Sequence, residues 1–127
     1  MIRTITALSL GAALLMPALA QARPSDVNAQ EFYARAKALE AKGMTAMFDK
    51  RTKPTMAQMK DAGEYARTAN AAATKRGAPL YCVPANAKGL NAEQVLVMLG
   101  KVPEAQRRSS TLSAAWLSTL KRTYPCG

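Results

Sequence analysis

The sequence contains no histidine, and this absence removes several classes of catalytic and metal site. Hydrolases that pair serine or cysteine with a histidine base are excluded, as are zinc sites that need an imidazole ligand. The only two cysteines, Cys82 and Cys126, lack the CxxC spacing of redox-active pairs. Glycines occur singly, so no phosphate-binding loop is present. We therefore expect a protein that is not an enzyme and that needs no cofactor or metal.

Acidic and aromatic residues are also scarce. There are 8 Asp and Glu against 18 Lys and Arg, and aromatic residues make up 6% of the chain. Such a surplus of positive charge attracts acidic partners, anionic lipid or polyanions, although a basic but inert surface fits the composition equally well. The few aromatics form no stacking platform for a single strand, so we do not expect nucleic acid as a partner.

Long hydrophobic runs are missing after the first 20 residues. Residues 1–20 have the three parts of a signal peptide: the positive Arg3, the apolar run 5–16, and a small-residue cleavage site that ends at Ala20. The apolar run of about 12 residues is too short for a membrane span, which needs about 20. We expect cleavage after Ala20 or after Ala22, export to the periplasm, and no membrane-spanning segment in the mature chain.

Export determines how the two cysteines are interpreted. Thiols oxidise in the periplasm, and an even number of cysteines in an exported chain usually pairs internally. A disulfide between Cys82 and Cys126 would stabilise the fold by about 4 kcal/mol in the chain-entropy model. An intermolecular disulfide and two free thiols remain as alternatives. The sequence predicts the intramolecular bond.

Apolar residues recur at helical spacing, and sustained strand alternation is absent. After a polar leader at 21–27, we expect a single all-α domain, residues 28–127, built as a small bundle of about four helices. The disulfide would staple the C-terminal helix pair. The expected helices run from the N-cap Asn28 to Gly43, from about Thr55 to Arg76 after a break at Pro54, from the N-cap Asn91 to Gly100, and over 112–120, with a short turn at 103–108.

The methionine pairs and one pair of acidic residues, in and before the second expected helix, each have a functional and a structural interpretation. The pairs Met44/Met47 and Met56/Met59 carry soft thioether ligands that suit Cu(I), but methionine at helical spacing more often fills a core. Asp61 and Glu64 share a helix face, which suits either an acid–base pair or a solvated, salt-bridged surface. The core and surface interpretations are favoured.

The C-terminal half, residues 81–126, resembles the Rap/Tai family of immunity proteins associated with the type VI secretion system. The residues that carry the resemblance are Tyr81-Cys82-Val83-Pro84, the apolar helix at 95–99, Pro103-Glu104, Arg107, the Ala- and Leu-rich helix at 112–120, and Tyr124-Pro125-Cys126. The resemblance implies a small periplasmic helical protein, often dimeric, that binds a secreted peptidoglycan amidase and blocks its active-site cleft. A homodimer is therefore one of the expectations.

The connection GMTAMFDKRTKP, residues 43–54, joins apolar residues to a basic cluster. Because aromatic residues, methionine and arginine are enriched in interface cores, we expect Met47, Phe48 and Arg51 to contact the partner. The alternative is that Met47 and Phe48 are ordinary core residues. The leading hypothesis for function is an immunity-type inhibitor of a secreted amidase. The alternative is a periplasmic accessory or chaperone-like protein that binds acidic envelope components or unfolded clients.

Overall fold

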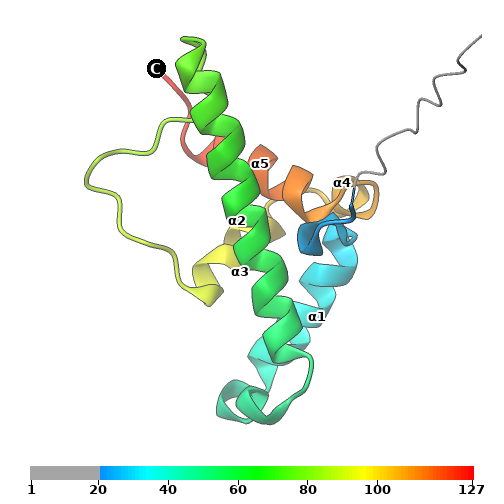
Figure 1. The fold of residues 1–127 in the computed structure, drawn as a ribbon. Helices are drawn as coiled ribbons and strands as arrows, with labels where there is room; N and C mark the ends of the chain where they lie inside the picture. The colour runs from blue at the N-terminus through cyan, green and yellow to red at the C-terminus, as the bar shows by residue number, and fades with distance from the viewer. Residues whose placement is uncertain (1–20) are drawn as a thin grey trace, which may run out of the picture.

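The computed structural model describes residues 21–127, and in this range the chain is helical without strands (Figure 1). The expected signal peptide, residues 1–20, lies outside the described residues. The elements are η1 (Pro24–Asp26), α1 (Ala29–Ala41), η2 (Gly43–Phe48), α2 (Thr52–Lys75), α3 (Ala92–Gly100), α4 (Glu104–Arg108) and α5 (Leu112–Thr123), where η denotes a 3₁₀-helix. The all-α prediction is confirmed. None of the helices described has the length and hydropathy that crossing a membrane requires.

Local capping residues determine most of the helix ends. The side chain of Asn28 accepts hydrogen bonds from two first-turn amides of α1, and Asn91 forms a capping box with Gln94 at the start of α3. Gly43 and Gly77 follow the last turns of α1 and α2 with φ angles of 57° and 77°. This left-handed conformation strains other residues, so both glycines end their helices as predicted.

Helix α2 starts earlier than the sequence indicated. We predicted a break around Pro54 and a start at Thr55, but the helix begins at Thr52. Pro54 is the third helical residue, a position where the backbone amide has no partner within the helix. A proline there loses no hydrogen bond, so it does not interrupt the helix.

The long helix α2 packs mainly against α5, through small residues. Ala62 and Ala66 are fully buried in the core cluster that also contains Trp116 and Leu120 of α5, and their small size allows α5 to approach. Small residues thus form this face of α2, where Ala62 is more deeply buried than the neighbouring Gly63. Close approach of this kind removes apolar surface from water without requiring large side chains on α2.

Helices α1 and α3 are held together around one buried arginine. Arg107, on α4, donates from Nε to the Gln30 side chain on α1 (2.7 Å) and from Nη1 to the carbonyl oxygens of Leu99, Gly100 and Val102. The same guanidinium lies over the ring of Tyr33 on α1, 4.3 Å from its centroid. Its charge therefore faces the electronegative carbonyl end of α3 and an aromatic face.

Gly100 allows the two helices to approach closely at this point. A Cβ atom on Gly100 would lie 2.9 Å from the hydroxyl oxygen of Tyr33, closer than the contact permits. A side chain at position 100 would therefore displace the Tyr33 hydroxyl, and the Tyr33 ring lies against Arg107.

The stretch predicted as a polar leader, residues 21–27, is part of the domain. Asp61 of α2 forms an ion pair with Arg23 (2.8 Å) and accepts hydrogen bonds from the amide and hydroxyl of the buried Ser25. These donors lower the pKa of Asp61 well below its usual range. The expected surface pairing of Asp61 with its helix neighbours is replaced by this clamp. Both expected cleavage positions precede Arg23 and would leave the clamp intact.

The disulfide between Cys82 and Cys126 is formed, with a Cα–Cα distance of 5.0 Å. The amide of Cys82 also donates to the carbonyl of Tyr124 (2.8 Å). Asn70 of α2 accepts hydrogen bonds from the amides of Leu80 and Tyr81, which fixes the chain leading into Cys82. The bond therefore holds the end of the chain beside the end of α2 (Figure 1). A disulfide is compatible with an extracytoplasmic location.

Removal of the disulfide tests its share of the stability. We expect the double substitution Cys82→Ser/Cys126→Ser to lower the free energy of unfolding by up to about 4 kcal/mol, because the unfolded chain regains the entropy of a 44-residue loop. Urea denaturation of the variant and of the reduced wild type should give the same loss. A difference below about 0.5 kcal/mol would show that packing alone holds the C-terminal end.

Candidate binding groove

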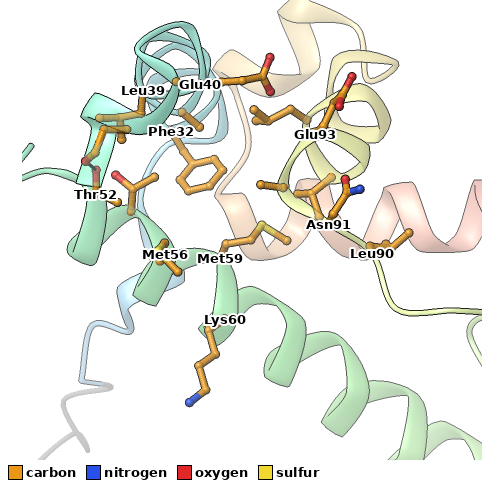
Figure 2. Close-up of a pocket in the computed structure, with 17 residues that line it drawn as sticks. Phe32, Leu39, Glu40, Thr52, Met56, Met59, Lys60, Leu90, Asn91 and Glu93 are labelled. Carbon is orange, nitrogen blue, oxygen red and sulfur yellow. Dashed lines mark hydrogen bonds between the residues drawn. The ribbon is translucent and has the colours of Figure 1, made fainter. Parts of the chain in front are cut away.

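An apolar groove opens between α1, η2, α2 and the start of α3 (Figure 2). Its volume is about 830 Å³, which lies in the range of sites that bind ligands or side chains of a partner. Most of the lining side chains are apolar. The lining residues are Phe32, Ala36, Leu39, Glu40, Gly43, Ala46, Thr52, Thr55, Met56, Met59, Lys60, Leu90, Asn91, Ala92, Glu93, Val95 and Leu96.

The interior of the groove is an extension of the hydrophobic core. Phe32 is 2% exposed, and its ring lies at the centre of the groove between α1, α2 and α3 (Figure 2). Ala36 and Leu39 follow on the same face of α1 at helical spacing. Across from them, Met59 is half-buried while Met56 is 67% exposed at the opening. The core thus continues to the surface, where it is left uncovered.

The charged residues at the mouth are arranged by sign. Glu40 from α1 and Glu93 from α3 lie on one side of the groove, and Lys60 from α2 lies on the other and points away from it (Figure 2). The nearest partner of Glu40 is Lys37, which donates a hydrogen bond of 3.3 Å on the exposed surface. The mouth therefore combines an acidic side with an apolar interior.

Next to the groove, η2 exposes three large apolar side chains: Met44, Met47 and Phe48, which we call the η2 face. Phe48 is 90% exposed and Met47 is 75% exposed. The alternative that these two residues belong to the core is therefore wrong. Because Gly43 and Ala46 of the same segment line the groove, the η2 face and the groove adjoin each other. The three side chains of the η2 face themselves do not line the groove.

Ion pairs fix the chain at the end of η2. Asp49 accepts hydrogen bonds from Arg51 at its two carboxylate oxygens (3.0 and 2.8 Å) and from Lys42 (2.7 Å). These cations hold the pKa of Asp49 far below its usual range. Arg51, the third predicted contact, is thus positioned beside the η2 face, where its side chain remains half-exposed. The three predicted residues come from one short segment of the chain.

The methionines differ from the favoured interpretation as core residues. Met44, Met47 and Met56 are exposed, and of the four only Met56 and Met59 line the groove. Flexible, polarisable methionine side chains at a surface adapt to the shape of a partner. Within residues 21–127, no three cysteine or carboxylate side chains form a group that could bind a metal. The geometry of this site is suited to binding an apolar segment.

The sequence predicted the η2 face as a contact surface but not the groove. The lining residues come from α1, η2, α2 and the segment before α3, and no local pattern joins these four regions. One signal was available: Met56 and Met59 recur at helical spacing, three residues apart, at the start of α2.

The chain has two phenylalanines in opposite environments, and they form a natural pair of test and control. We expect Phe32→Ala to lower the free energy of unfolding by about 3 kcal/mol, because a fully packed ring is lost. We expect Phe48→Ala to change it by less than about 0.5 kcal/mol, because the ring is already in solvent. Urea denaturation measures both values. A comparable loss in the two variants would contradict the exposed position of the η2 face.

Comparison of the chain with known proteins found no matching family model, no similar curated protein and no similar solved structure. The functional interpretation therefore depends on the chemistry of the site.

Proposed function

We propose that the protein acts by binding another protein through the groove and the η2 face. The observations that support this proposal are the apolar groove, which reaches the surface at Met56, and the exposed side chains of Met47 and Phe48 on the neighbouring η2. Large exposed apolar areas are costly in water and mark interaction sites on folded proteins. Methionine, phenylalanine and arginine are also the residue types enriched in interface cores, and all three occur here.

We propose a secreted peptidoglycan-cleaving amidase as the partner, which the protein inhibits as an immunity protein in the periplasm. The resemblance of residues 81–126 to the Rap/Tai family suggests this partner. Three physical features support it: a disulfide suited to an oxidising compartment, a short exposed 3₁₀ segment of a size to enter a cleft, and a net charge of +10 that attracts an acidic surface. Inhibition of this kind requires contact and no turnover.

The same apolar surface also supports a second candidate, an accessory or chaperone-like protein that binds unfolded clients in the periplasm. Exposed methionines accept varied apolar sequences, as such a role requires. The two functions differ in stoichiometry. An inhibitor binds one folded enzyme at a fixed ratio, whereas a chaperone suppresses the aggregation of many unfolded proteins.

The amidase effectors encoded in the same genome provide the test. We expect the purified protein to bind one of them at a fixed stoichiometry in calorimetry and to stop its hydrolysis of peptidoglycan in a turbidity assay. Phe48→Asp should weaken the affinity by about 100-fold, as for a central interface residue, without unfolding the protein.

Val83→Asp is the matched control, because Val83 is also an exposed apolar residue but lies beside the disulfide at the other end of α2. It should bind like the wild type. Absence of inhibition of every such amidase would refute the immunity function. Suppressed aggregation of unfolded proteins at variable ratios would favour the chaperone-like role instead.

A further inference from the structure

The mouth of the groove has an acidic side in an otherwise basic protein. The net charge is +10, and only 8 carboxylate residues are present, yet two of them, Glu40 and Glu93, line the groove. They come from neighbouring helices that pack on each other, and their side chains lie on the same side of the opening (Figure 2). Among the described residues that line the groove, the single lysine, Lys60, points away from it. Carboxylates therefore predominate among the charged side chains at the mouth.

Glu40 is placed where it does not help its own helix. It lies in the last turn of α1, where the helix dipole is negative and a carboxylate is unfavourable. The exposed pair with Lys37 offsets little of this, since such pairs contribute about 0–1 kcal/mol. Glu93 does stabilise the first turn of α3, but Asn91 already caps that end. A role in binding accounts for Glu40 where helix stability does not.

The walls of the groove determine the backbone form of its occupant. All four are helical segments or helix ends, and their polar side chains are already used: Thr52 donates to Ala46, Thr55 donates to Arg51, and Asn91 accepts from Gln94. No strand edge faces the groove in the described part of the chain, so an extended peptide cannot add a strand to a sheet there. An occupant whose backbone is satisfied internally, a helix, needs no such edge.

We propose that the groove binds an amphipathic helix of the partner protein, with its apolar face on the exposed Met56 and Leu90 and a lysine or arginine paired with Glu40 and Glu93. This inference rests on the proposed function only in taking the helix to belong to a partner protein. The apolar interior provides the affinity, and the two carboxylates select the charge and orientation of the helix.

Two synthetic peptides test the proposal without the natural partner. Both are amphipathic helices of about four turns with the same apolar stripe, and they differ only in carrying two lysines or two glutamates beside it. Fluorescence anisotropy with the full protein should show at least about tenfold tighter binding of the lysine peptide, and high salt should reduce the difference. Glu40→Lys/Glu93→Lys should reverse the preference.

The control variant is Glu64→Lys/Glu104→Lys, which changes the net charge equally at exposed carboxylates that do not line the groove. It should keep the preference for the lysine peptide. Equal binding of the two peptides, binding of neither, or the same reversal by the control variant would overturn the proposal. So would a change in the sedimentation of the protein alone caused by the groove substitutions, because a second copy would then be the occupant.

The outcome is separable from that of the amidase test. If Glu40→Lys/Glu93→Lys still inhibits the amidase with unchanged affinity, the groove inference fails while the immunity function stands. If the peptides behave as expected but no amidase is inhibited, the groove binds a basic helix of a different kind of protein.

Discussion

The arrangement of the groove depends on the buried guanidinium of Arg107 and on the groups that it contacts. Among the described residues no carboxylate forms an ion pair with it, and its charge is instead stabilised by carbonyl oxygens at the end of α3, by Gln30 and by the face of Tyr33. A buried charge without such partners would cost several kcal/mol. The three elements that supply them, α1, α3 and the turn before α4, are thereby held in one geometry, and two of them form walls of the groove.

The two ends of α2 differ in what packs against them. At one end, the disulfide, Asn70 and the small residues facing α5 concentrate the stabilising contacts. At the other end, the core opens into the groove, and Phe48 is left in solvent. Exposed apolar surface lowers stability and solubility. In this protein it lies at the end of α2 opposite to the disulfide, which stabilises the fold. Such a division suits a protein that acts by contact, since its binding surface is formed before the partner arrives.

Interactions between residues close in the sequence were predictable, and those between distant residues were not. Asn28, Gly43 and Asn91 mark helix ends by their own chemistry, and two cysteines in an expected export substrate allow one internal pairing. The packing of the leader on Asp61 and the burial of Arg107 join residues far apart, such as Arg107 and Gln30, 77 positions distant. The spacing of apolar residues along the sequence does not predict such contacts. The start of α2 was predicted wrongly for a different reason. Proline disrupts the interior of a helix, but Pro54 lies in the first turn, where it is tolerated.

The most direct test of the central claim is amide hydrogen exchange, followed by mass spectrometry, on Arg107→Met, which keeps the length of the stem but removes the charge and its donors. If Arg107 fixes the walls of the groove, amides of α1 and α3 will exchange faster in the variant, while those of α2 and α5 near the disulfide will keep their protection. Unchanged or increased protection of α1 and α3 would contradict the account, because it would show that apolar packing alone sets the geometry of the groove.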